Sequence, residues 1–214
     1  MLIPSNVDHL VIAAPVLAEC VEQCHANLGV LPIAGGVHPG LGTANALLGL
    51  TTAGAHRVYL ELIGPDPEQD PDLAAARLAG ITEPTVQRWA ICPDDFDSAV
   101  ATAAKSQDPI VDLGEVYDMS RRIPEGELLE WRLTRRTPLA LGGIQPFLID
   151  WKSSPHPSEQ AMPAVELEAF WATSPDADET RSILDVLAAR IETEAGVSES
   201  LHATLKGPGG SWTI

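Results

Sequence analysis

Strand-like apolar runs alternate with segments of helical hydrophobic spacing along the chain. Residues 7–13 are rich in β-branched side chains and predict a strand. Pro15 suits the first turn of a helix, because proline has no N–H to satisfy there, and Gly29 suits a left-handed helix end. A Gly- and Pro-rich loop is predicted over 35–43, followed by strands at 45–50 and 58–63. The apolar face of the predicted helix has its members three or four residues apart: Leu17, Cys20, Val21, Cys24 and Leu28.

The same order of elements returns twice more. Residues 86–92 predict a strand, Pro93 opens a helix, and strands follow at 116–119, 128–133 and 147–151. A third copy begins at Val165, has its helix-opening proline at Pro175 and closes with a hairpin. The three helix-opening prolines lie 78 and 82 residues apart. This spacing indicates a repeated module.

The repeat predicts the fold class and the domain organisation. We expect an α+β fold in which paired βαβββ modules form a cupped, barrel-like mixed sheet, with a partial third module at the C-terminus. The first module spans 1–64, a connector with a short helix near 72–78 spans 65–85, and the second module spans 86–152. Residues 153–214 form a second connector and the partial βαββ module. Modules of this size are too small to fold separately, so we expect one domain over 1–214.

Composition narrows the class of partner. Thirty acidic against thirteen basic residues give a formal charge of −17, which disfavours binding to nucleic acid. No apolar stretch approaches the roughly 18 residues that span a bilayer, and the first residues lack the pattern of a secretion signal. Three cysteines, two of them on a predicted apolar helix face, do not suggest a disulfide framework. We therefore expect a cytoplasmic protein with no nucleic-acid or membrane partner, and the small-molecule substrate or ligand is suggested by the strand residues and the resemblance described below.

Polar residues inside the predicted strands mark the candidate chemistry. His9 alternates with Val7 and Val11, so all three side chains face one side of the sheet. Glu61 is flanked by apolar residues on both sides. A buried carboxylate without a partner costs several kcal/mol, so a cation, a metal or a hydrogen-bond donor is expected opposite Glu61. His9 and Glu61 together are a candidate metal pair.

Aligning the modules on their helix-opening prolines extends this pair. Gln87 lies six residues before Pro93, as His9 lies six residues before Pro15, and its amide oxygen can coordinate a hard divalent ion. The acid on the last strand of the second module is Asp150. The strict register places Ile149 at the position of Glu61, and a slip of one residue reverses the face that Asp150 occupies.

Four motifs resemble a known family. The segments DHLVIA (8–13), GGVHPGLGTANALL (35–48), YLELIGPDP (59–67) and PFLIDW (146–151) are similar to the glyoxalase-like branch of the vicinal oxygen chelate superfamily. The resemblance covers nearly the whole chain. It implies a divalent metal (Zn, Ni, Fe, Mn or Mg) on the first and fourth strands of the modules, and often a homodimer. Carried over to this sequence, the metal ligands are His9, Glu61, Gln87 and, in the place of the usual Glu or His, Asp150.

The implied activity is that of a metal-dependent enzyme of the lyase, isomerase or dioxygenase type. The ion would chelate two adjacent substrate oxygens, and Glu61 or His38 would move a proton. Two alternatives stay open: a metal-free binding protein like the bleomycin-resistance members of the superfamily, and a degenerate structural relative. An inward Asp150 favours the enzyme, and an outward Asp150 beside an aromatic pocket favours the binding protein.

Further side chains are candidates for holding the substrate. His38, Thr43 and Asn45 cluster in the Gly-rich segment, which is otherwise explained as a tight turn. Arg121 and Arg132 belong to five arginines within residues 121–136, which form either a clamp for an anionic group or cross-strand pairs with nearby glutamates. Trp151 would line an aromatic pocket together with Trp89 and Trp131.

Overall fold

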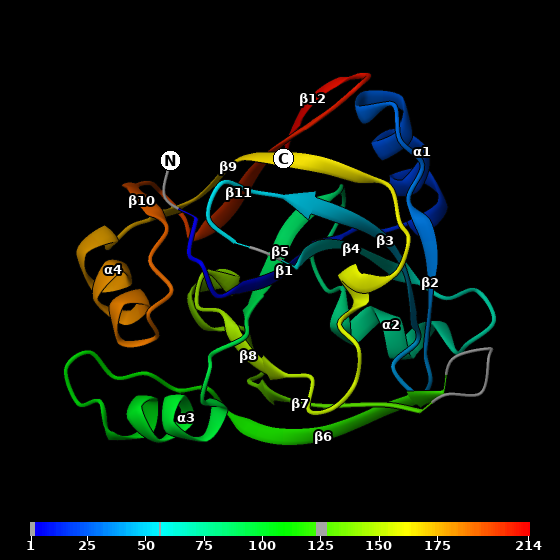
Figure 1. Cartoon of the computed structure of the whole chain (residues 1–214). Helices are drawn as coiled ribbons and strands as arrows, with labels where there is room; N and C mark the ends of the chain where they lie inside the picture. The colour runs from blue at the N-terminus through cyan, green and yellow to red at the C-terminus, as the bar shows by residue number, and fades with distance from the viewer. Residues whose placement is uncertain (1–2, 56, 123–127) are drawn as a thin grey trace.

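The computed structural model describes residues 3–55, 57–122 and 128–214. Within these ranges it confirms the predicted α+β class: four α-helices pack against one mixed sheet of twelve strands (Figure 1). The sheet is cupped but not closed, because β12 and β6 lie at opposite ends of the strand order. No described helix combines the length and the apolar character needed to cross a membrane.

The first repeat contains one helix and four strands. Its elements are β1 (Val7–Ala13), α1 (Leu17–Leu28), β2 (Ile33–His38), β3 (Thr43–Thr51) and β4 (Val58–Pro65). Strand β2 corrects the predicted loop over 35–43, since it pairs with β3 as an antiparallel hairpin. Helix α1 begins two residues after Pro15, with Val16 as its cap, and ends at Gly29 with a φ of 72°. The proline therefore lies ahead of the helix and not in its first turn.

The second and third repeats follow the same order. Between the first two lies α2 (Pro71–Arg77), and the second contains β5 (Thr85–Ile91), α3 (Phe96–Lys105), β6 (Glu115–Arg122), β7 (Leu128–Arg135) and β8 (Phe147–Asp150). The third contains β9 (Ala164–Ser174), α4 (Ala177–Val186), β10 (Glu192–Ala195), β11 (Ser200–Gly207) and β12 (Gly210–Thr213). Short strand β10 is added there to the predicted strand, helix and hairpin.

Pairing between β1 and β5 joins the first two repeats. These strands run antiparallel, and each has a parallel neighbour on its other side, β4 beside β1 and β8 beside β5. The full order is β12-β11-β9-β3-β4-β1-β5-β8-β7-β6, with β10 added to β9 and β2 added to β3. Two register shifts interrupt the β1–β5 pairing, between Val7 and His9 and between Val11 and Ile12. These irregularities change which side chains reach each face.

The two faces of the central strands have different surroundings. One face packs with helices α1, α3 and α4 into the main apolar core. Trp89 belongs to this core: it is fully buried, contacts the Phe170 ring and donates its indole N–H to the Ile144 carbonyl at 2.7 Å. Trp89 therefore does not line a pocket, contrary to the expectation from sequence. The opposite, concave face carries His9 and Glu61, and helix α2 covers one end of it through a small cluster: Val11, Ala13, Ile63, Ala74 and Leu78.

Candidate functional site

A buried carboxylate fixes the orientation of His9. Asp8 and His9 are neighbours on β1, and both are buried, with 2% and 3% of their surface exposed. Asp8 Oδ1 lies 2.5 Å from His9 Nδ1, and Asp8 Oδ2 accepts a hydrogen bond from the Trp151 indole at 3.0 Å and lies 3.1 Å from His156 Nε2. Burial raises the pKa of Asp8, but hydrogen bonds from His156 and His9 outweigh it and lower the pKa to about 2. Asp8 is thus ionised, and it can only accept.

The tautomer of His9 follows from this contact. Because the ionised Asp8 carboxylate can only accept a hydrogen bond, the His9 Nδ1 atom that faces it carries a hydrogen. Its Nε2 atom is left to act on other groups. The imidazole also stacks on Tyr59, with ring centres 4.5 Å apart, and meets the edge of Phe147 at 5.4 Å. His9 is therefore held on three sides.

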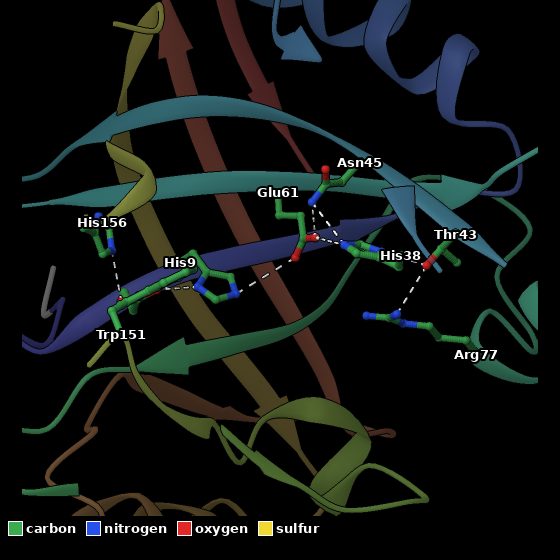
Figure 2. Close-up of polar contacts among 9 residues, drawn as sticks. His9, His38, Thr43, Asn45, Glu61, Arg77, Trp151 and His156 are labelled. Atoms are coloured by element: carbon green, nitrogen blue, oxygen red, sulfur yellow. Dashed lines mark hydrogen bonds and ion pairs between the residues drawn. The ribbon is translucent and has the colours of Figure 1, made fainter. Parts of the chain in front are cut away.

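Glu61 lies between two histidines (Figure 2). Parallel pairing of β1 with β4 places His9 opposite Tyr59, so strand alternation brings Glu61 to the same face. Glu61 Oε2 lies 4.0 Å from His9 Nε2, and Glu61 Oε1 lies 3.6 Å from His38 Nε2. Asn45 donates to Oε1 at 2.6 Å. The structure thus brings together four of the residues singled out in the sequence.

Electrostatics keep Glu61 ionised despite its burial. Burial raises the pKa of Glu61, but the charges of His38 and His9 and the hydrogen bond from Asn45 hold this pKa below its ordinary value. Because Asn45 occupies Oε1, the Oε2 atom nearer His9 is the oxygen with spare capacity to accept a proton. The arrangement is chemically suited to proton transfer.

Thr43 connects His38 to helix α2. The Thr43 hydroxyl lies 2.9 Å from His38 Nδ1 and accepts a hydrogen bond from Arg77 at 3.2 Å (Figure 2). With Arg77 donating to the oxygen, the hydroxyl hydrogen is available to His38 Nδ1. His38 Nε2 lies 3.6 Å from Glu61 Oε1 and 3.4 Å from the Asn45 amide nitrogen, so a hydrogen on Nε2 serves Glu61 and a lone pair there accepts from Asn45.

Other predicted site residues do not join this group. Gln87 lies in the register shift of β5, and its amide donates to the Arg77 carbonyl at 3.2 Å. Asp150 faces outward: its carboxylate accepts from Arg132 at 2.8 Å, and Arg132 also pairs with Asp97 on α3. Asp150 and Arg132 therefore neutralise each other on the outer face, contrary to their expected places as metal ligand and substrate clamp.

The remaining two substrate candidates have different outcomes. The side chain of Arg121 lies outside the described residues. Trp151 lies beside Trp131, with ring centres 5.6 Å apart, but its indole N–H is used by Asp8. Trp151 thus supports the Asp8–His9 pair.

Sequence reasoning missed Asp8, Arg77 and Arg88, whereas His156 was a candidate from its position after the last strand of the second repeat. A signal existed for Asp8, an acid inside the apolar run DHLVIA, and for Arg88, an arginine inside the apolar strand VQRWAIC. Strand alternation alone assigns Asp8 to the face away from His9. Only the register shift between Val7 and His9 brings the two side chains together. The same shift moves Val7 into the main core, so the prediction that Val7 shares a face with His9 was wrong.

The residues present do not fit the four-ligand metal site that the family resemblance implies. His9 and Glu61 supply two donors, and the Gln87 Oε1 atom is buried without a hydrogen-bond partner among the described residues. Within the described ranges, however, no group of three or more His, Cys, Asp or Glu side chains is placed to hold a metal. On the second-repeat side the corresponding face carries Arg88, Phe147 and buried Ile149. A guanidinium and two apolar side chains are not metal ligands.

The cupped sheet of βαβββ units and the buried polar cluster on its concave face fit the glyoxalase-like branch of the vicinal oxygen chelate superfamily, in which a divalent metal is common. The family model described as glyoxalase-like domain matches residues 7–188, and the chain belongs to this family.

Solved structures extend the comparison. A hypothetical protein from Staphylococcus aureus is 14% identical over 97% of both chains, with a TM-score of 0.68, which shows that the fold spans the whole chain. A variant of Streptomyces coelicolor methylmalonyl-CoA epimerase, solved in complex with 2-nitronate-propionyl-CoA, is 26% identical over 68% of this chain and 96% of its own, with a TM-score of 0.46. The curated proteins give no match.

Proposed function

We propose that this protein is an isomerase- or lyase-type enzyme that moves a proton on a small oxygen-bearing substrate bound at the concave face. The observation that carries the proposal is the buried Glu61 carboxylate between two imidazoles, 4.0 Å from His9 Nε2 and 3.6 Å from His38 Nε2. A carboxylate and imidazoles on one apolar-walled face are the groups that general acid–base catalysis uses.

Each residue then has a definite task. Glu61 Oε2 removes a proton from the carbon next to a substrate carbonyl and becomes a carboxylic acid. The developing enolate oxygen takes a hydrogen bond from His38 Nε2–H. His9 Nε2 takes this proton from Glu61 and returns it to a different atom of the substrate for an isomerisation, or to the leaving group for an elimination, which leaves Glu61 ionised again. Asp8 and Asn45 act as positioning residues, since each fixes one catalytic side chain.

Deuterium exchange tests this proposal without knowledge of the natural substrate. Short oxo acids, hydroxy ketones and acyl thioesters are incubated with the enzyme in D₂O, and loss of the α-proton signal is followed by NMR. We expect exchange for at least one class, and a rate lowered by about 100-fold or more in Glu61→Gln. Glu168→Gln, whose carboxylate pairs with Lys206 on the third repeat, is the matched control and keeps the wild-type rate. Absence of exchange in every class, or undiminished exchange by Glu61→Gln, would overturn the proposal.

The assay also addresses the metal question. The mechanism uses only side chains, so we expect the exchange rate to survive chelator treatment and gel filtration. Elemental analysis of the wild type, His9→Ala and Glu61→Gln accompanies it. One metal per chain that is lost in both variants, together with exchange lost on chelation and restored by Zn, Ni, Fe, Mn or Mg, would replace this mechanism with a metal-dependent one.

A metal-free binding protein is the second candidate. Two observations favour it: Asp150 faces outward, and the Trp131 and Trp151 rings form an aromatic pair on the second repeat. A flat aromatic ligand would then quench tryptophan fluorescence stoichiometrically while every compound in the exchange panel stays unchanged. Turnover of any panel member argues for the enzyme.

A further inference from the structure

Five arginines with described side chains have a carboxylate partner. They are Arg57, Arg132, Arg136, Arg181 and Arg190. Arg77, Arg88 and Arg135 differ, because no ion pair among the described residues includes any of them. This is unexpected in a chain with thirty acidic residues and thirteen basic ones. Burial lowers the pKa values of Arg77 and Arg88, and both are close enough to Glu61 for its charge to oppose that shift.

Arg88 lies on the concave face, and one of its N–H donors makes no hydrogen bond among the described residues. It lies opposite Val11 in the β1–β5 pairing, so strand alternation directs it to the face that carries His9. Its Nε atom is buried and has no hydrogen-bond partner among the described residues. A buried charged donor without a partner is costly, and service to a ligand is one physical reason for a protein to retain such a group.

Positive charge accumulates around this donor. Burial, together with the charges of Arg77 and Arg135, lowers the pKa of Arg88 to about 10, and Glu61 alone among the neighbours acts against this shift. Arg77 donates its described hydrogen bond to the neutral Thr43 hydroxyl. Arg135 lies over the Tyr117 ring at 4.0 Å. An anion bound here would be attracted by three guanidinium groups and opposed by one carboxylate.

The position of Phe147 links this charge to the catalytic cluster. Its ring centre lies 5.9 Å from the Arg88 guanidinium carbon and 5.4 Å from the His9 ring centre. A short molecule that lies over Phe147 would reach Arg88 with one end and His9 with the other.

We infer that Arg88 and Arg77 form the subsite for the carboxylate of the substrate, which makes the substrate class a short oxo acid with its acidic C–H directed at Glu61. This inference rests on the proposed function for the reacting end of the molecule only. A planar carboxylate matches the two parallel N–H donors of a guanidinium group. Phosphate is the other oxyanion that arginine binds in this way.

Isothermal titration calorimetry with malonate tests the subsite independently of activity. Malonate, malonamide and inorganic phosphate are titrated into the wild type at low ionic strength. We expect malonate to bind and malonamide, its neutral counterpart, not to bind. Affinity for malonate should fall about tenfold or more in Arg88→Met and in Arg77→Met, since each loses a charged hydrogen-bond donor but keeps most of the apolar stem. Arg57→Met removes an outward, paired arginine and keeps the wild-type affinity.

The outcomes separate this inference from the proposed function. Arg88→Lys keeps the charge and should recover part of the affinity, because a positive charge at this position still attracts the carboxylate. Equal malonate affinity in wild type and Arg88→Met, or no binding of malonate by the wild type, overturns the subsite. Tighter binding of phosphate than of malonate overturns its assignment to a carboxylate. Malonate binding through Arg88 without any deuterium exchange leaves the subsite standing and removes the proton-transfer function.

Discussion

The Asp8 carboxylate lies 2.5 Å from the His9 Nδ1 atom while its other oxygen accepts from Trp151 and faces His156. One acidic side chain on β1 thereby connects the first repeat to the segment that follows β8. A histidine whose ring is fixed at Nδ1 presents a defined Nε2 atom to Glu61, so a single buried contact sets the geometry of the candidate site.

Replacing Asp8 with asparagine should be strongly destabilising. The asparagine amide keeps one oxygen acceptor, but its NH₂ group faces hydrogen-bond donors that the second carboxylate oxygen had served. Loss of this buried, charged partner should lower the free energy of unfolding by about 3 kcal/mol. Urea denaturation followed by circular dichroism measures the loss in the free energy of unfolding. Asp118→Asn is the control, because Asp118 pairs with Lys152 at the exposed surface, and its midpoint should stay unchanged. Equal midpoints for both variants would contradict the buried network.

Local hydrophobic spacing was sufficient to predict the repeated strand and helix order, because each element shows its own period in the sequence. Strand β2 was not predicted from the sequence, because its pairing with β3 depends on the side chain of Asn45, which lies nine residues after Gly36. The Asn45 side-chain oxygen accepts a hydrogen bond from the Gly36 N–H at 2.7 Å, and it occupies the space that a Cβ on Gly35 would need. Glycine is uncommon in strands, but here the absence of a side chain is what allows β2 to form.

The candidate site was predictable where strand alternation is regular and unpredictable where it is not. His9 and Glu61 share a face by simple alternation. Asp8 and Gln87 lie at the two register shifts of the β1–β5 pairing, and their side chains therefore depart from the expected faces. A register shift depends on contacts between two strands, and neither strand alone carries the information.

Gly42 should tolerate alanine far less well than Gly40. Both have positive φ, 72° at Gly40 and 69° at Gly42, so each alanine variant carries a backbone cost of about 1 kcal/mol. A Cβ on Gly40 meets nothing within 4 Å, whereas one on Gly42 would lie 2.5 Å from the Ala74 nitrogen and 2.7 Å from the Leu73 Cβ.

We therefore expect Gly42→Ala to lose about 1–3 kcal/mol more stability than Gly40→Ala, as overpacking does in buried positions. Thermal denaturation of both variants measures the difference. Because Thr43 follows Gly42 and contacts His38, Gly42→Ala should also slow any activity. Identical melting temperatures for the two variants would show that helix α2 does not pack against this turn.

The three cysteines should be unreactive in the folded protein. Burial raises the pKa of Cys20 to about 12 and that of Cys24 to about 11, and burial with the charge of Asp8 raises that of Cys92 to about 11. A thiol of ordinary pKa is about a quarter thiolate at pH 8, while these thiols are about 0.1% thiolate or less. Iodoacetamide labelling, read by mass spectrometry, should be at least about 100-fold slower in native than in urea-unfolded protein. Rapid labelling of any thiol in the native state would contradict this burial.

Trp89→Phe should reduce stability without changing ligand binding. The replacement leaves the Ile144 carbonyl, which accepts from the indole at 2.7 Å, without its partner and opens space beside Phe170 in the main core. Together these effects should lower the free energy of unfolding by about 2–4 kcal/mol. Since the Trp89 ring lies on the opposite side of the sheet from Arg88, the malonate affinity of the folded variant should equal that of the wild type. Calorimetric titration below the unfolding transition provides the comparison, and a changed affinity would mean that the two faces of β5 are coupled.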